Sequence, residues 1–282
     1  MARDPHDQSS AVRRIGDFEV TAISDGSLQA SPDVVLGVSR EDCKALLGTA
    51  ANNPFELAVN CCLIRHQQTI VLVDAGGGSA VATLGRLPDN LRAVGIAPEA
   101  VETILLTHLH SDHANGLVDA QGAAVFPNAE LVMHQKEAGF WLDRRVTPDD
   151  PERLRRNTLG AQRATAPYRD RIRRMREGEV LPGITAVLLD GHTPGHTGFL
   201  LQSRGERLLV WGDVVHLAAI QVPRPEAALV FDVDPQAAVA ARRRAFEWTA
   251  SERLLIAGAH FDFPGFGHMV REGEGYRFEA AP

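Results

Sequence analysis

The sequence predicts a mixed α/β (α+β) fold in which helices cover buried sheets on both sides. Several short segments are continuously apolar, as in ETILLTH (102–108) and RLLVWGD (207–213), which is typical of strands buried on both faces. Amphipathic helical segments alternate with these strands, and the clearest of them covers residues 235–251. No Pro-, Gly- or Ser-rich linker divides the chain, so we expect a flexible N-terminal segment (1–17) followed by one domain (18–282).

Apolar runs and turn-forming residues place the expected elements along the chain. Residues 18–26 alternate and end in Asp-Gly, which predicts a strand and a turn. Residues 58–78 contain two apolar strands around a polar turn and end in Asp74 and three glycines, which would allow a close approach of the backbone. The remaining expected elements are a helix at 83–96, strands at 102–108 and 129–134, an Arg-rich helical region at 135–176, strands at 184–191, 198–203 and 207–213, a helix at 235–251 and a last strand at 253–260.

Composition narrows the class of protein. The 282 residues are 44% apolar and 23% charged, which is ordinary for a globular chain with a sizeable core. The net charge of -7 argues against nucleic acid or an anionic membrane as the main partner, because both favour a basic surface. Three cysteines (Cys43, Cys61 and Cys62) do not form a disulfide framework, and neither a secretory signal nor a long apolar span is evident. We therefore expect a cytoplasmic protein.

One short loop, THLHSDHANG (107–116), indicates a metal site. It places four metal-competent side chains within six residues: His108, His110, Asp112 and His113. Such a cluster would be costly to bury unless a metal ion compensated it. On extended backbone the first and third residues of H-x-H point to the same side, so His108 and His110 can bind one ion. Asp112 and His113 follow where the chain turns, toward a second position. Imidazole and carboxylate ligands suit zinc, with iron and manganese as alternatives.

Other expected strands also end in metal-competent residues. Asp74 ends IVLVD, Asp213 ends LLVWGD, and His260 ends LLIAGAH. Two further histidines, His192 and His196, lie in the loop DGHTPGHTG. Buried strands that lie side by side can bring such residues together at one edge of a sheet. For His192 two interpretations stay open, a residue that supports a metal ligand and a brace within its loop.

These residues, in this order, resemble the metallo-β-lactamase superfamily over about residues 18–278. The resemblance implies a four-layer αββα sandwich with a dinuclear site at one sheet edge. It implies two divalent ions, with zinc expected and iron, manganese or cobalt as alternatives. Carried over by motif, the first ion would be bound by His108, His110 and His196, the second by Asp112, His113 and His260, with Asp213 bridging both and Asp74 supporting the ligands.

Within the superfamily, the sequence is most similar to the methyl parathion hydrolase group and its lactonase relatives, in residues 83–117, 125–142 and 260–278. This similarity implies that Trp141 belongs to the substrate pocket, although a plain core tryptophan is an equal alternative. It also leads us to expect a homodimer. His216 stands three residues after the bridging aspartate, where related lactonases typically have a tyrosine, so we expect it to reach the substrate carbonyl or the leaving oxygen.

The chemistry that the resemblance implies is hydrolysis of a small-molecule ester, lactone or phosphotriester. A metal-bridged hydroxide would attack the carbonyl, because metal-bound water can have a pKa of about 7. Asp112 or Asp213 would carry the proton to the leaving group. His113 after the loop aspartate, and Asp213 where true β-lactamases often have a cysteine, argue against β-lactam hydrolysis. Two alternatives stay open: an organophosphate (methyl parathion-type) hydrolase, and a mononuclear iron thiol oxygenase of the same fold.

Overall fold

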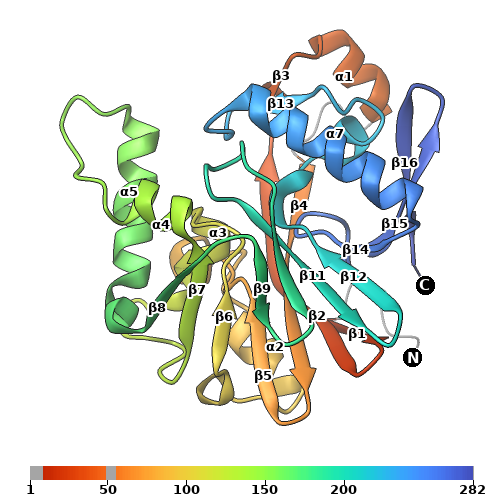
Figure 1. Cartoon of the computed structure of the whole chain (residues 1–282). Helices are drawn as coiled ribbons and strands as arrows, with labels where there is room; N and C mark the ends of the chain where they lie inside the picture. Colours follow the sequence, from red (N-terminus) through yellow and green to blue (C-terminus); the bar gives the residue numbers. More distant parts are fainter. Residues whose placement is uncertain (1–8, 49–54, 282) are drawn as a thin grey trace, which may run out of the picture.

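Two seven-stranded β-sheets lie at the centre of the molecule, in a computed structural model that describes residues 9–48 and 55–281 (Figure 1). The first sheet consists, in spatial order, of β1 (Ser10–Ile15), β2 (Phe18–Ala30), β4 (Phe55–His66), β5 (Thr69–Val73), β6 (Thr103–Leu105), β7 (Glu130–His134) and β8 (Ile172–Met175). The second consists of β16 (Gly275–Ala280), β15 (Phe266–Glu272), β14 (Leu255–Ala257), β12 (Glu206–Val210), β11 (Thr197–Ser203), β10 (Ile184–Leu188) and β9 (Gly178–Leu181). A small additional sheet pairs β3 (Val35–Leu36) with β13 (Ala228–Leu229).

Helices cover the outer faces of both sheets (Figure 1). The α-helices of the described chain are α1 (Arg40–Leu47), α2 (Leu87–Ala93), α3 (Ser111–Ala114), α4 (Gln135–Trp141), α5 (Glu152–Thr165), α6 (Ala218–Gln221) and α7 (Pro235–Ser251), of which α2, α4, α5 and α7 lie on the sheets. Leu91 of α2 and Ala161 of α5 share a buried cluster with Ile104 of the first sheet. Phe246 of α7 shares another cluster with Leu209 of the second sheet. The layers are therefore αββα, as predicted. In the described part of the chain, none of the helices has the length and apolar character that a membrane span requires.

A third apolar cluster fills the space between the two sheets. Val20 and Leu105 enter it from the first sheet, and Phe199 and Val210 enter it from the second. Consecutive side chains of a strand point to opposite faces, so Leu105 packs between the sheets while its neighbour Ile104 packs under the helices. Both faces of β6 are thus buried, which explains the continuous apolar run in its sequence.

The polar residues singled out in the sequence follow strands that run in parallel. Strands β5, β6 and β7 are parallel to one another, and so are β12 and β14. Asp74 follows β5 directly, and His108 comes three residues after β6 ends. Asp213 and His260 each come three residues after β12 and β14 end. Because the carboxyl ends of parallel strands meet at one edge, this topology delivers all four residues to the same end of the sandwich.

The prediction of a flexible segment over residues 1–17 was wrong for residues 10–15. These residues form β1, which pairs antiparallel with β2 from Ser10 opposite Ile23 to Ile15 opposite Phe18. Only Ile15 of this strand is fully buried, so its side chains give a weak apolar pattern. Backbone pairing to β2 stabilises the strand instead. Residues 1–8 lie outside the described part of the chain.

Two further segments differ from the expectation. The region 135–176 contains α4 and α5 as predicted, but it ends in strand β8, which pairs in parallel with β7. The sequence also gave no clear signal for the hairpin of β15 and β16 at the edge of the second sheet. These strands are short or partly exposed, so tertiary pairing decides their conformation. By contrast, α7 covers the predicted residues 235–251.

A buried carboxylate fixes the glycine-rich loop after Asp74. Asp25 accepts hydrogen bonds from the backbone N–H groups of Gly77 (2.8 Å), Gly85 (3.1 Å) and Leu87 (2.9 Å). Gly76 has φ +72°, and a Cβ there would lie 2.5 Å from the Asp25 carboxyl carbon. We expected the glycines to permit close backbone approach near the metal site; the structure shows close approach at Gly76, and its neighbour there is the Asp25 carboxylate, which is not a candidate ligand.

We expect Asp25→Ala to lower the free energy of unfolding by about 3 kcal/mol, because three backbone donors lose their acceptor in a buried setting. Urea denaturation measures this change. Asp170→Ala is the matched control, because its carboxylate is 94% exposed and its loss should have little effect. Equal stability of the Asp25 variant and the parent protein would contradict the role assigned to Asp25.

Candidate metal centre

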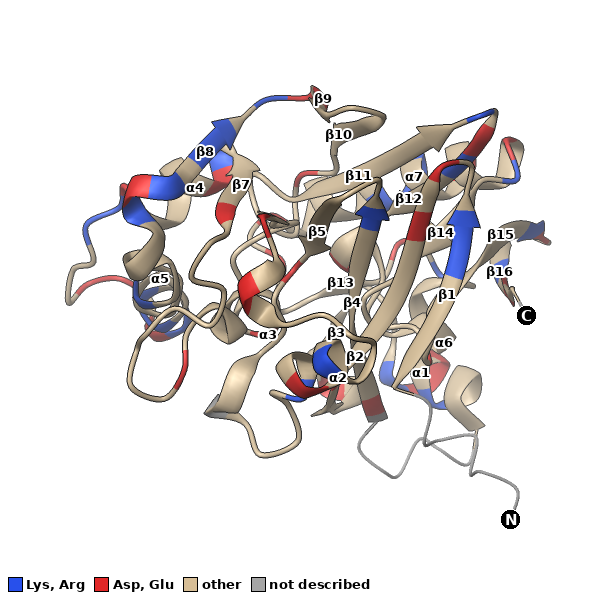
Figure 2. Cartoon of the chain, turned by 90° about the horizontal axis from the view of Figure 1, so that it is seen from below, with Lys and Arg blue, Asp and Glu red and all other residues tan. Residues whose placement is uncertain are grey.

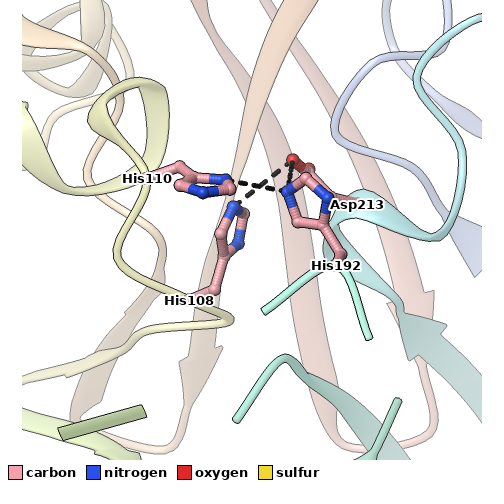
Figure 3. A group of neighbouring side chains, drawn as sticks. All are labelled: His108, His110, His192 and Asp213. Carbon is pink, nitrogen blue, oxygen red and sulfur yellow. Dashed lines mark hydrogen bonds and ion pairs between the residues drawn. The ribbon is translucent and has the colours of Figure 1, made fainter. Parts of the chain in front are cut away.

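Four buried side chains from three loops form a first ligand group. The potential ligand atoms of His108, His110, His192 and Asp213 all lie within 4.8 Å of one another. His110 Nδ1 is 2.8 Å from His192 Nε2, and Asp213 Oδ2 is 3.2 Å from that same nitrogen. His108 Nε2 is 3.4 Å from Asp213 Oδ2. Figure 3 shows these side chains pointing toward one another from separate segments of the chain.

A second ligand group shares the same aspartate. The potential ligand atoms of Asp112, His113, Asp213 and His260 also lie within 4.8 Å of one another. His113 Nε2 and His260 Nε2 are 3.0 and 3.2 Å from Asp213 Oδ1. The Oδ1 atom of Asp213 thus faces the second group, while its Oδ2 atom faces the first. This division places Asp213 where a bridging ligand of two ions must lie.

The hydrogen bonds of the imidazoles show that the donor set fits metal ions. Within the described chain, the Nε2 atoms of His108, His113 and His260 are buried and have no hydrogen-bond partner. The opposite ring nitrogen of His113 bonds to Asp74 Oδ2 (2.8 Å), and that of His260 bonds to the Ala58 carbonyl (2.8 Å). These bonds fix Nδ1 as the protonated atom and leave the Nε2 lone pair directed into the site. Cations compensate such buried lone pairs.

Asp74 supports both ligand groups from behind. It has φ +61°, and its Oδ1 atom accepts the backbone N–H of Thr107 at 2.8 Å. Its Oδ2 atom accepts the Thr107 hydroxyl at 2.8 Å as well as His113 Nδ1. The Thr107 hydroxyl oxygen lies 3.0 Å from His108 Nδ1 and can accept a hydrogen bond from its N–H. A single carboxylate therefore orients one imidazole of each group.

In the structure His192, and not His196, lies among the candidate metal ligands. His196 belongs to neither ligand group, because its Nε2 atom accepts the backbone N–H of Asp213 (2.9 Å) and its Nδ1 atom bonds to the Leu189 carbonyl (2.9 Å). His192 takes the ligand position instead. The assignment of His196 as a ligand was therefore wrong. Two histidines four residues apart in an irregular loop cannot be told apart by spacing alone.

Asp232 is a functional residue that the sequence analysis missed. Its Oδ1 atom lies 2.8 Å from His192 Nδ1, and its Oδ2 atom accepts the backbone N–H of Leu229 at 2.8 Å. These bonds direct His192 Nε2 toward Asp213. Asp232 lies in the irregular segment FDVD, and no sequence signal separated it from a surface aspartate.

The prediction that Trp141 lines the substrate pocket was wrong. Its side chain is 1% exposed and belongs to the cluster between the first sheet and its helices. The indole N–H donates to Glu137 Oε1 at 2.7 Å. The ring also meets His110 edge to face, with 5.7 Å between ring centroids. Trp141 thus packs behind a ligand, which corresponds to the alternative of a core tryptophan.

Glu137 connects the two histidine-bearing loops of the first ligand group. Its carboxylate is fully buried, and Oε1 accepts the backbone N–H of Leu109 at 2.8 Å. Its Oε2 atom accepts the Thr193 hydroxyl (2.6 Å) and the backbone N–H of Gly195 (3.0 Å). Burial raises the pKa of Glu137, and these hydrogen bonds oppose that effect. The sequence contains no motif that marks this residue.

Burial and neighbouring carboxylates shift the pKa values of the histidines in the site. Burial lowers the pKa of His192, but hydrogen bonds to Asp213 and Asp232 more than offset this effect and raise the pKa to about 9. Burial also lowers the pKa of His113 and His260, yet the Asp213 carboxylate raises both above their ordinary value. Metal ligands must be neutral imidazoles. Ion uptake therefore displaces protons, and affinity for the metal rises with pH.

A cavity of about 200 Å³ opens above the two ligand groups. The candidate ligands that line it are His110, Asp112, His192, Asp213 and His260, and His216 lines it beside them. Leu57 and Phe231 give it apolar surface, and helix α5 (Glu152–Thr165) forms another part of its wall. A small molecule in this cavity would contact both ligand groups at once.

Comparison with known proteins identifies the family. Residues 54–260 match the family model described as the metallo-beta-lactamase superfamily, which covers more than half of the chain. The chain belongs to the metallo-β-lactamase superfamily. Together with the two ligand groups that share Asp213, this membership supports a metal-dependent hydrolase with a dinuclear metal centre. The superfamily also accounts for the αββα layers.

Similar proteins and structures are consistent with this membership. Over 166 residues the chain is 28% identical to the uncharacterized protein YobT of Bacillus subtilis (strain 168), covering 58% of this chain and 65% of that protein. It is 27% identical over 175 residues to the N-acyl homoserine lactonase AiiB of Agrobacterium fabrum, covering 55% and 61%. The matched region thus spans less than two thirds of these relatives. The crystal structure of hydrolase AbOPH in the beta lactamase superfamily has a TM-score of 0.90 at 33% identity, covering 97% of this chain and 98% of that one. The dizinc quorum-quenching lactonase AidC has the same fold, with a TM-score of 0.89 at 24% identity and coverage of 98% and 99%.

Metal analysis tests whether His192, rather than His196, binds one of the ions. We expect His192→Gln to retain about one zinc per chain after dialysis, whereas His196→Gln retains about two, because glutamine can still accept the Asp213 N–H but is a poor zinc ligand. Inductively coupled plasma mass spectrometry measures the stoichiometry. Loss of an ion from the His196 variant alone would contradict this ligand assignment.

Proposed function

We propose that this protein hydrolyses lactones, and esters of similar shape, at the dinuclear centre. The observation that carries the proposal is the position of Asp213, whose two oxygens face two separate ligand groups on the floor of one cavity. The similarity to N-acyl homoserine lactonase AiiB supports a lactone as substrate. The buried ligands and the small cavity also suit a compact substrate rather than a macromolecule.

Two divalent ions bound there would lower the pKa of a shared water and polarise the substrate oxygen. The chain positions these ions and controls proton movement. Asp213 has both oxygens directed at ligand groups, so it is poorly placed to carry a proton. Asp112 is 17% exposed, and its Oδ2 atom faces His260 Nε2 at 3.5 Å. Its other carboxylate oxygen is therefore the better candidate for holding the proton that the leaving group needs.

We also propose that His216 holds the substrate. Its Nε2 atom is 2.9 Å from Asp213 Oδ2, and its ring stacks on His260 with 5.0 Å between centroids. The Gln221 side chain accepts the backbone N–H of His216 at 2.8 Å and fixes the turn that presents it. Burial lowers the pKa of His216, so the ring is neutral near pH 7 and has one N–H to donate. In the structure this N–H is directed at Asp213 Oδ2; once ions occupy that carboxylate, the same N–H can bind the carbonyl or the leaving oxygen of a substrate.

The second ligand group argues against the mononuclear iron oxygenase. Asp112, His113 and His260 would have no ligand role in a site with one ion, yet the Nε2 atoms of both histidines are buried and unpaired within the described chain. Organophosphate hydrolysis remains a prediction, because the same arrangement of ions and cavity can accept a phosphotriester.

A substrate panel tests the proposed function. We expect protein with measured metal content to hydrolyse dihydrocoumarin or an N-acyl homoserine lactone with a higher kcat/KM than methyl paraoxon. Chelation should abolish all activity, and Asp213→Asn should lower kcat at least about 100-fold because it weakens the shared ligand. Turnover of none of these compounds would refute the proposal, and one iron per chain would favour the oxygenase.

The role of His216 has its own test. We expect His216→Ala to lower kcat on the best lactone about 10-fold to 100-fold, through the loss of one hydrogen bond made in the transition state. His216→Tyr should recover part of the rate, since a phenol can donate the same bond. Metal content should stay unchanged in both variants. A His216→Ala enzyme with full kcat would remove this residue from the mechanism.

A further inference from the structure

Helix α5 gives the cavity above the metal centre a cationic wall. Arg153 and Arg156, which are three residues apart and so lie on the same side of the helix, both line this cavity. Asn157 and Ser111 line it beside them with neutral hydrogen-bonding groups. Figure 2 shows lysine and arginine positions gathered on α5 and on neighbouring β8. Candidate metal ligands and this wall therefore line the same open cavity.

Two contacts fix the position of Arg153 in the lining of the cavity. Its guanidinium donates to the Val230 carbonyl and lies over the Phe231 ring, 5.4 Å from the centroid. These contacts connect α5 to the segment that precedes Asp232, the residue that orients His192. No carboxylate of the described chain forms an ion pair with Arg153, so its contacts fix the guanidinium in place without neutralising it.

Arg156 is exposed and likewise has no ion-pair partner in the described part of the chain. Other arginines of the same region are paired: Arg144 with Asp150, and Arg174 with Asp143. Arg155 and Arg163 of α5 also have no ion-pair partner within the described residues, so what distinguishes Arg156 is its position in the cavity lining. A guanidinium without a protein partner in a substrate cavity is available to a ligand.

The charges around the cavity do not cancel. The carboxylates that line it are Asp112 and Asp213, and both belong to the ligand groups. Two divalent cations would outweigh these two carboxylates, and Arg153 and Arg156 add further positive charge. The cavity is thus cationic although the whole chain has a net charge of -7. Such a cavity attracts anionic molecules.

We propose that the natural substrate carries an anionic oxygen group, a carboxylate or a phosphate, that binds Arg153 and Arg156 while its lactone or ester bond lies over the metal centre. This inference rests on the proposed function and narrows its substrate class. Guanidinium groups bind such oxygens with paired, charge-assisted hydrogen bonds. The amide of Asn157 and the hydroxyl of Ser111 can satisfy the remaining oxygen lone pairs. A neutral lactone would leave both arginines unused.

Three lactones that share the same five-membered ring test the inference. They are γ-valerolactone, the analogue with a carboxylate in place of its methyl group, and the analogue with a phosphomonoester on that methyl. We expect one of the anionic lactones to have a kcat/KM about 10-fold or more above the neutral one. The anionic lactone with the higher kcat/KM shows whether the site prefers a carboxylate or a phosphate. The preference should shrink at high ionic strength, because salt screens exposed charges.

Substitutions in α5 test whether Arg156 causes the preference for an anionic lactone. Arg156→Gln should raise KM for the preferred anionic lactone about 10-fold and leave the neutral lactone within about twofold, whereas Arg156→Lys should retain part of the preference. Arg155→Gln is the matched control, because Arg155 lies on the same helix but does not line the cavity. Equal kinetics for all three lactones, or equal effects of Arg156→Gln on all three, would overturn the inference while leaving lactone hydrolysis intact.

A binding experiment keeps the inference testable if no lactone is hydrolysed. Ring opening of the carboxylate lactone adds water across the acyl C–O bond and gives 2-hydroxyglutarate, which has two carboxylates. We expect isothermal titration calorimetry on the metal-loaded protein to show about 10-fold weaker binding of this product by Arg156→Gln than by Arg155→Gln. Equal affinities would overturn the inference, whatever the outcome of the activity assays.

Discussion

The structure depends on one buried carboxylate, Asp213, and on the imidazoles that surround it. Its Oδ2 atom faces His108 and His192, and its Oδ1 atom faces His113 and His260. So many buried polar groups without hydrogen-bond partners would cost free energy unless cations compensated them. Two cations shared by these residues would offset this cost, and they would supply Lewis-acid chemistry at the same position.

Carboxylates behind the ligands make this arrangement specific. Asp74, Asp232 and Glu137 each accept hydrogen bonds from a loop that carries ligands, and the first two also bond directly to an imidazole. Asp74 and Asp232 therefore determine which ring nitrogen faces the ions, and Glu137 holds two of the loops together. The parallel strands bring the loops to one edge of the sandwich, and these carboxylates orient the side chains once they are there. On the opposite wall, Arg153 and Arg156 direct the cavity toward an anionic substrate.

The layers of the fold could be predicted from the sequence, because strands covered on both faces leave continuous apolar runs and α7 leaves an amphipathic pattern. The loop His108–His113 could be recognised because no packing rule explains it. The choice between His192 and His196 could not be made, since it depends on which ring accepts the Asp213 N–H. Asp232 was missed and Trp141 was misassigned for a related reason: burial and partners decide their roles, and these come from tertiary contacts.

Anomalous diffraction from crystals of the zinc-loaded protein, recorded at the zinc edge, tests the central claim most directly. The account predicts two peaks about 3.5–4 Å apart on either side of the Asp213 carboxylate, with His192 bound to one and His260 to the other. A single peak, or a peak bound by His196 in place of His192, would contradict it.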